Sequence, residues 1–301
     1  MHEDRTRGGI YALSAFMCWG LFPLYFKAVA AVPALEMLSH RALWVLVSIW
    51  PVILILGWSK RIRAVFLDRR AIRFIFWSAM LLTVNWLIFI WAIASGYVLQ
   101  SSLGYYINPL VNVVLGVAFL GERLKWVQWS AVGLACCGVG VMIFVLGEIP
   151  WIALSLAVTF GIYGLLRKQA PVDAMTGLFV ETLLVSPLAL CYLVWLWAEG
   201  SAVVTVDSGS LLYLVIASGV VTAAPLILFT AGARRLPLSV LGLFQYIVPT
   251  GHFMLAVFIF GEPFTQWHLV SFGLIWAALA LYTVDTLRRR NTEVTQQEDS
   301  A

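Results

Sequence analysis

The sequence predicts an all-α membrane protein with ten transmembrane helices, and three observations predict it. The chain of 301 residues is 62% hydrophobic and 11% charged, with a mean hydropathy of +0.93, whereas a soluble surface needs about twice that charged fraction. Its apolar residues form continuous runs, mostly of about 20 residues, the length of a membrane-crossing helix. These runs lack the alternation of a β-barrel strand. Basic residues, finally, are confined to alternate loops.

The ten predicted spans follow one another with short loops. They cover residues 9–30, 34–57, 74–94, 98–119, 126–146, 150–166, 174–197, 209–231, 238–260 and 266–286. Basic residues precede the first span and follow every even-numbered one: Arg5, Arg7, Lys60, Arg61, Arg63, Arg69, Arg70, Arg73, Arg123, Lys125, Arg167, Lys168, Arg234, Arg235, Arg288, Arg289 and Arg290. The opposite loops carry only the acids Glu148, Glu199, Asp207 and Glu262. By the positive-inside rule, this multi-pass protein has both termini in the cytoplasm.

The two halves of the chain resemble each other at an offset of about 140 residues. Pro109 aligns with Pro249, and Gly121-Glu122 aligns with Gly261-Glu262. Five spans per half insert the second copy upside down, so we expect inverted repeats at residues 8–147 and 148–287, followed by a cytoplasmic tail at 288–301. This architecture is typical of secondary transporters, whose site lies near mid-depth at the repeat interface.

Several segments also match a known family. They are Ser39-His40-Arg41 with Trp44, Asn85-Trp86, residues 102–110 (SLGYYINPL), Arg167-Lys168, Glu181-Thr182 and residues 245–249 (QYIVP). On these segments, and over nearly all of residues 8–287, the chain resembles the EamA-type transporters of the drug/metabolite transporter superfamily, specifically the RarD branch. The resemblance implies two five-helix repeats, a central cavity, alternating access and a location in the bacterial cytoplasmic (inner) membrane. It supplies no substrate.

Charged side chains inside the predicted spans are functional candidates, because a charge in hydrocarbon is costly unless it is paired or hydrated. Glu36 and His40 are four residues apart and share a helical face. Lys27 and Glu36 lie at similar depth, so they can form a pair. The alternative is that Lys27, Glu36 and Arg41 extend to the outer headgroups. We therefore assign Glu36 and Arg41 to proton coupling or ion pairing.

Glu181 is the second candidate carboxylate, about seven residues into the seventh span. Under inversion its depth mirrors that of Glu36. A carboxylate that is alternately exposed and desolvated can carry a proton. Equally, Glu181 can neutralise Arg167 or Lys168 near the inner surface.

Uncharged polar and aromatic residues at mid-depth predict the substrate site. Pro109 and Pro249 free backbone carbonyls that a ligand can use, although each can also be a packing kink. Aromatic rings can stack on a substrate or cover a cation. The predicted substrate-binding residues are Trp19, His40, Asn85, Trp86, Tyr105, Tyr106, Asn108, Tyr163, Gln245, Tyr246 and His252.

The function that follows is a secondary active transporter, exporting a small metabolite or amphiphilic compound, with proton coupling left open. The chain has no GxxxxGK[ST] loop, so ATP-driven pumping by this chain is excluded. The alternatives are an uncoupled facilitator or channel, which would need rings of like residues, and a membrane enzyme. An enzyme would need a cluster of acids or histidines at a membrane face, and the loop at 58–73 has only Asp68.

The expected partners are a small-molecule substrate and membrane lipids. Nucleic acid is not expected, because the net charge of +4 is spread over short clusters beside apolar runs. The four cysteines are too dispersed for a metal site, and no cofactor is predicted. Small residues at Ala131, Ala135 and Gly138 permit close helix contacts. Whether these contacts join helices of one chain or form a homodimer is open.

Overall fold

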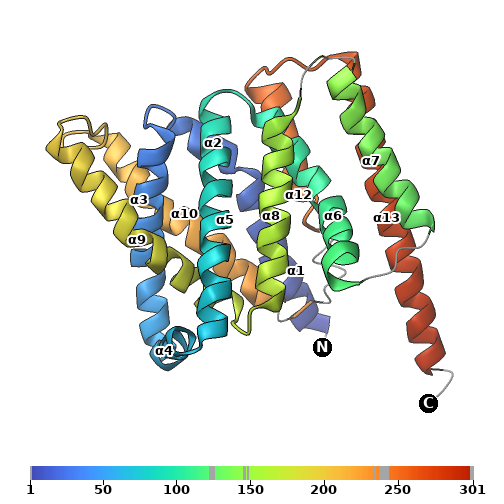
Figure 1. Ribbon diagram of the computed structural model, residues 1–301, viewed down its shortest axis with the longest axis horizontal. Coiled ribbons are helices and arrows are strands. Elements are labelled where there is room, and N and C mark those ends of the chain that lie inside the picture. Colours follow the sequence, from blue (N-terminus) through green and yellow to red (C-terminus); the bar gives the residue numbers. More distant parts are fainter. Residues whose placement is uncertain are drawn as a thin grey trace.

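The computed structural model describes residues 2–121, 126–144, 147, 149–233, 235–236 and 244–298. Within these residues every regular element is a helix and none is a strand, so the predicted all-α class is confirmed. Most helices run roughly along one direction, with α9 at one edge of the molecule and the pair α7 and α13 at the other (Figure 1). The predicted loop residues Arg123, Lys125, Glu148 and Arg234 lie outside the described residues.

The helices follow the predicted spans closely. They are α1 (His2–Gly20), α2 (Phe22–Ala28), α3 (Ala34–Ile55), α4 (Ser59–Leu67), α5 (Arg69–Ala94), α6 (Val98–Leu120), α7 (Trp126–Phe144), α8 (Trp151–Gln169), α9 (Ala174–Ala198), α10 (Ser210–Ala233), α12 (Ile247–Met254), the π-helix η1 (Leu255–Ile259) and α13 (Gln266–Glu298). Nine segments of the described chain are long and apolar enough to cross a membrane, the first combining α1 and α2. The predicted span 238–260 is described only from residue 244, as the shorter apolar segment Ile247–Ile259.

Two aspartates fix the starts of helices at the same end of the bundle. The Asp68 carboxylate accepts hydrogen bonds from the backbone N–H of Arg70 and Ala71, at 2.8 and 3.2 Å. Asp173 accepts from the backbone N–H and the hydroxyl of Thr176, at 3.0 and 2.7 Å. Each carboxylate satisfies an N–H that has no partner within its own helix. α4, which the sequence analysis treated as loop, packs against α5 at this end.

Prolines affect the helices unequally. The first span breaks at Leu21, where Pro23 begins α2 and the fixed backbone of proline suits a first turn. By contrast, α6 continues through Pro109 and α10 through Pro225. Pro249 is the third residue of α12, and α12 continues directly into the π-helical turn of η1. The carbonyl of Pro249 accepts a hydrogen bond from the Ser102 hydroxyl at 2.8 Å, which ties α12 to α6.

Small residues set how closely several helices approach. A Cβ added to Gly219 of α10 would collide with the backbone of Trp44 in α3. Gly138 of α7 lies against Ser271 of α13, whose hydroxyl donates to the Gly138 carbonyl at 2.7 Å. The predicted small-residue face of 131–138 is therefore used within the chain, between α7 and α13. The start of α1, the end of α13 and α4 all lie at one end of the bundle, shown at the bottom of Figure 1.

Candidate functional site

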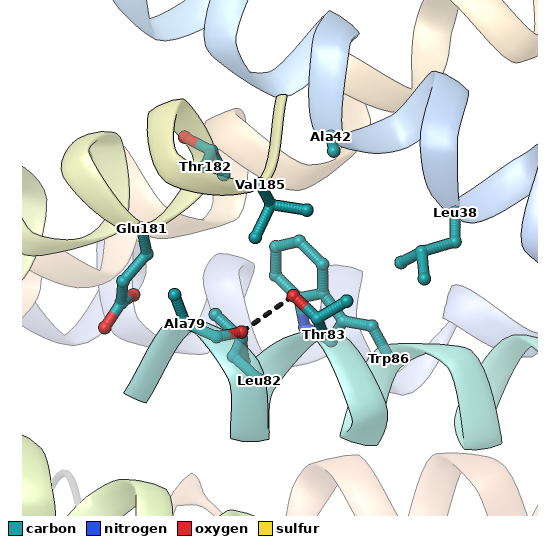
Figure 2. A pocket seen from close by; sticks show the side chains of 9 residues that line it. All are labelled: Leu38, Ala42, Ala79, Leu82, Thr83, Trp86, Glu181, Thr182 and Val185. Carbon is teal, nitrogen blue, oxygen red and sulfur yellow. Dashed lines mark hydrogen bonds between the residues drawn. The ribbon is translucent and has the colours of Figure 1, made fainter. Parts of the chain in front are cut away.

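A small pocket lies between α3, α5 and α9, near the middle of the bundle. It is lined by Leu38, Ala42, Ala79, Leu82, Thr83, Trp86, Glu181, Thr182 and Val185 (Figure 2). Its volume is about 10 Å³, room for roughly one water molecule. The walls are mostly apolar, with Glu181 near one end and Trp86 near the other. In this conformation the pocket is therefore too small for a metabolite.

Glu181 lies in a polar cluster that joins three helices. Its carboxylate accepts hydrogen bonds from the Ser78 hydroxyl of α5 at 2.5 Å and the Tyr163 hydroxyl of α8 at 3.4 Å. The Arg167 Nε atom of α8 lies 3.8 Å from Glu181 Oε1. Glu181 is 1% exposed and Arg167 12% exposed, so this pair is shielded from solvent. This geometry suits both roles considered for Glu181, proton transfer and neutralisation of Arg167.

Arg41 of α3 stacks on the ring of Trp86, which lines the pocket, and is 3% exposed. Its guanidinium carbon lies 4.0 Å from the centroid of the Trp86 ring and 5.2 Å from that of Phe26. Its Nε atom donates to the Thr222 hydroxyl of α10 at 3.1 Å. No carboxylate oxygen among the described residues lies within 4.0 Å of this guanidinium.

His252 is the centre of an aromatic cluster between α5, α6 and α12. Its ring centroid lies 5.5 Å from that of Phe89 and 5.4 Å from that of Tyr105. The Nε2 atom is 3.1 Å from the Trp19 carbonyl oxygen of α1, while the buried Nδ1 atom has no hydrogen-bond partner. Trp19 itself packs on Phe16 at a centroid distance of 5.3 Å, toward the end that carries the termini.

The polar residues predicted for substrate binding have different surroundings. Asn85 is 1% exposed, and its amide nitrogen donates to the Leu156 carbonyl at 3.0 Å and the Thr159 hydroxyl at 2.8 Å. The buried Oδ1 atom of Asn108 has no partner, and Gln245 is exposed. His40 is half-buried.

Two predicted tyrosines bond to threonines. The Tyr106 hydroxyl lies 2.7 Å from the Thr250 hydroxyl, joining α6 to α12. The Tyr246 hydroxyl lies 3.1 Å from that of Thr283 in α13. The structure therefore brings Trp86, Tyr105, Arg41 and His252 into one connected region. Tyr246 instead contacts α13.

Two other carboxylates bind backbone amides at the opposite end of the bundle. Glu36, fully buried, accepts from the N–H of Val203 at 3.0 Å and of Val204 at 2.8 Å. Glu262 accepts from the N–H of Val98 and Leu99, both at 2.7 Å, at the start of α6. The proposed pair of Lys27 with Glu36 is not formed; the Lys27 amine lies 5.8 Å from the Phe260 ring centroid.

Among the described residues outside the predicted spans, Glu262 is the side chain whose pKa is shifted. Burial raises the pKa of this carboxyl group, and the Leu99 and Val98 amides and the charge of Lys27 oppose the rise. The described residues contain no group of three or more His, Cys, Asp or Glu side chains that could hold a metal ion.

Sequence reasoning missed Ser78 and Thr222, the hydroxyl partners of Glu181 and Arg41. The pattern that marks them is a hydroxyl residue inside an apolar run. Many serines and threonines share that pattern and bond only to their own helix, as Thr83 does with the Ala79 carbonyl at 2.7 Å. Pairing across 103 and 181 residues becomes visible only in three dimensions.

Comparisons with known proteins agree with this architecture. The model of the EamA-like transporter family matches residues 6–144. An uncharacterized transporter of Vibrio cholerae is 47% identical over 95% of this chain and 95% of the relative. Protein RarD of Escherichia coli K12 is 44% identical over 95% of this chain and 97% of its own length.

A solved crystal structure shares the fold alone. It superposes with a TM-score of 0.59 at 18% sequence identity, over 93% of this chain and 98% of that chain. The predicted transporter class rests on the sequence relatives, which cover nearly the whole chain at much higher identity. This chain is a multi-pass membrane protein that belongs to the EamA-like transporter family and, within it, to the group of RarD proteins.

Proposed function

We propose that this chain is a secondary active transporter that exports a small metabolite or amphiphilic compound across the bacterial cytoplasmic membrane by alternating access. The observation that carries the proposal is the small pocket beside Glu181, together with charged contacts at both ends of the bundle: Glu181 with Arg167 toward one end, and Glu36 with the Val203 and Val204 amides at the other. A carrier must pass through a state in which neither side has access to its site.

The arrangement of helices supports a pair of inverted repeats, residues 8–147 and 148–287. In that assignment α12 with η1 is the ninth of ten spans. α6 contacts α8, and the matching contact after exchange of the repeats joins α12 and α1. Likewise, the contact of α5 with α8 is matched by that of α10 with α1, and α3 with α10 is matched by α9 with α5. These three contacts between halves thus each have a counterpart, whereas the smaller contact of α6 with α13 has no matching contact of α12 with α7 of similar extent.

Close approaches at single residues support the same assignment. Gly20 of α1 lies against Gly251 of α12, and Gly161 of α8 lies against Val111 of α6. The sequence offset pairs Gly20 with Gly161, and it pairs Val111 with Gly251. The same kind of contact between the two halves therefore occurs twice, with the roles of the halves exchanged.

Charged groups suit the role of gates at the two ends. Toward the end that carries the termini, Glu181 holds Arg167 of α8. At the opposite end, Glu36 holds the segment at 203–204 and Glu262 holds the start of α6. We assign the first end to the cytoplasm from the distribution of basic residues. Opening to one side at a time requires breaking one of these sets while the other stays intact.

Proton coupling is assigned to Glu181. Protonation removes the negative charge that attracts Arg167, and it weakens a contact between α8 and α9 that is shielded from solvent. A proton entering from the outside would therefore loosen the cytoplasmic gate. The Ser78 and Tyr163 hydroxyls, which donate to the ionised form, stabilise the closed state.

The test is transport by the purified protein in lipid vesicles against a panel of labelled metabolites, with and without an imposed proton gradient. We expect saturable flux with counter-exchange, accelerated by the gradient. Flux that rises linearly with concentration and shows no counter-exchange would indicate a channel instead. A tag in the loop at 199–209 should react only from outside the cell, and a cytoplasmic tag would reverse the assigned orientation.

A further inference from the structure

Arg41 is a buried cation that has no partner of opposite charge among the described residues. It is the eighth residue of α3, about 10 Å along the helix from its start, and it is 3% exposed. No carboxylate oxygen of the described residues lies within 4.0 Å of its guanidinium. The neighbouring acid on α3, Glu36, has its carboxylate bound to the Val203 and Val204 amides. A lone charge at this depth is costly unless something neutralises it.

Aromatic rings stabilise the Arg41 cation only in part. The guanidinium carbon lies 4.0 Å from the Trp86 centroid, 5.2 Å from Phe26 and 5.9 Å from Phe22. Stacking on a ring attracts the cation, but it leaves the net positive charge in place. It also provides no acceptor in the plane of the guanidinium, where the N–H groups point.

The hydrogen-bonding capacity of Arg41 is also incompletely used. Nε donates to the Thr222 hydroxyl at 3.1 Å, whereas the buried Nη1 has no hydrogen-bond partner. Buried N–H donors in folded proteins nearly always have an acceptor. The titratable side chains that interact electrostatically with Arg41 are Tyr25 and Tyr105, and tyrosine hydroxyls are ordinarily uncharged near neutral pH. Both the missing charge and the missing acceptor would be supplied by one anion.

We propose that Arg41 binds the carboxylate of the transported molecule, with the Trp86 ring against the apolar part of that molecule. This inference rests on the proposed transport function and names its substrate class: amphiphilic monocarboxylates. A single negative charge fits better than a phosphate ester with nearly two, because the excess charge would be left uncompensated in the interior. Since the pocket is too small for a metabolite here, the ligand reaches Arg41 only when the helices part during the transport cycle.

The test uses matched pairs of carboxylates and their neutral amides on the purified full-length protein in detergent. The probes are benzoate with benzamide, phenylacetate with phenylacetamide, and N-acetylphenylalanine with its amide, and binding is measured by calorimetry. We expect at least one carboxylate to bind saturably and at least tenfold more tightly than its amide. Arg41→Gln should weaken that binding at least tenfold, and Arg41→Lys should retain part of it. Chloride at equal concentration should not compete.

A matched control is Arg61→Gln, since Arg61 also stacks on a tryptophan, at 4.7 Å from the Trp58 centroid, but is exposed on α4. It should bind the carboxylate like the wild type. If Arg41→Gln does not fold, Thr222→Val serves in its place, because it removes the acceptor that orients Nε and keeps the charge. We expect this variant to bind the carboxylate two- to fivefold more weakly.

The inference is overturned by any of three results: equal binding of acid and amide, unchanged binding in the folded variants, or no binding of any of the three acids. Saturable exchange of neutral compounds alone in vesicles overturns it while leaving the transport function intact, whereas carboxylate binding without any exchange removes the transport function instead.

Discussion

Gly251 of α12 lies against Gly20 of α1 so closely that a Cβ added to Gly251 would be 2.9 Å from the Gly20 carbonyl oxygen and 3.0 Å from its Cα. Backbone atoms cannot move aside as a flexible side chain can. We therefore expect Gly251→Ala to lower the free energy of unfolding by about 1–3 kcal/mol, the usual cost of overpacking. Thermal unfolding of the purified protein in detergent measures this loss.

Alanine substitutions at two other glycines serve as comparisons for Gly251→Ala. A Cβ on Gly20 would be 3.4 Å from the Ile247 carbonyl oxygen, so Gly20→Ala should cost less than Gly251→Ala. A Cβ on Gly273 of α13 meets nothing within 4 Å, and alanine favours a helix over glycine. Gly273→Ala should therefore be neutral or slightly stabilising. Equal effects at Gly251 and Gly273 would contradict the close packing of α1 on α12.

Glu36 anchors a loop that is remote in the sequence. Its Oε1 atom accepts from the Val203 and Val204 amides, and its Oε2 atom also accepts from Val203. In a Gln side chain one of these oxygens becomes an NH₂ group, a donor that faces the Val203 N–H instead of an acceptor. We expect Glu36→Gln to destabilise this loop by about 1–3 kcal/mol, the penalty for a buried donor left without its partner. Hydrogen exchange at the Val203 and Val204 amides should accelerate.

The matched control for that loop is Glu199→Gln, because Glu199 is exposed at the end of α9. It should leave exchange at Val203 and Val204 unchanged. Exchange that is unaffected by Glu36→Gln would show that other contacts hold the loop.

Replacement of Glu181 by Gln separates coupling from transport. The Gln side chain is neutral, as a protonated Glu181 would be, so the attraction for Arg167 is lost permanently. We expect Glu181→Gln to abolish flux driven by a pH gradient and to keep exchange of substrate across vesicles. A variant that still responds to the gradient like the wild type would assign Glu181 to neutralisation of Arg167.

Asn85 and Asn108 should respond differently to alanine. The Asn85 amide bonds α5 to Leu156 and Thr159 of α8, so Asn85→Ala should lower the unfolding free energy by about 1–3 kcal/mol. Asn108 Oδ1 has no partner to lose, and Asn108→Ala should leave stability near that of the wild type. Melting temperature and the KM of exchange, measured on both variants, distinguish a structural role from contact with substrate. A lower melting temperature in Asn108→Ala and an unchanged one in Asn85→Ala would contradict this assignment.

Hydropathy predicted the helices well because each span must satisfy its own backbone within lipid. The predicted run at 34–57, for example, is α3 at Ala34–Ile55. The first break was also accessible to sequence reasoning, through Pro23. Pro109 was not, since tertiary contacts keep α6 helical around it.

The partners of charged residues could not be predicted in the same way. Glu36 and Lys27 have similar depth, but depth fixes only one coordinate, and the rotation of each helix decides which side chains meet. Glu36 instead binds amides 167 residues away. Arg41 reaches α10 for a similar reason, and its lack of a carboxylate partner became apparent only once the helices were packed.

The Trp86 indole lines the pocket and also covers the Arg41 guanidinium. Any molecule that displaces this ring while filling the pocket also changes the surroundings of the cation. Coupling between two binding sites is reciprocal. If an anion bound at Arg41 changes the affinity of the pocket by some factor, a molecule bound in the pocket must change the affinity of Arg41 for the anion by the same factor. Through this one side chain, binding of the apolar part of an amphiphile and binding of its charged part are energetically coupled.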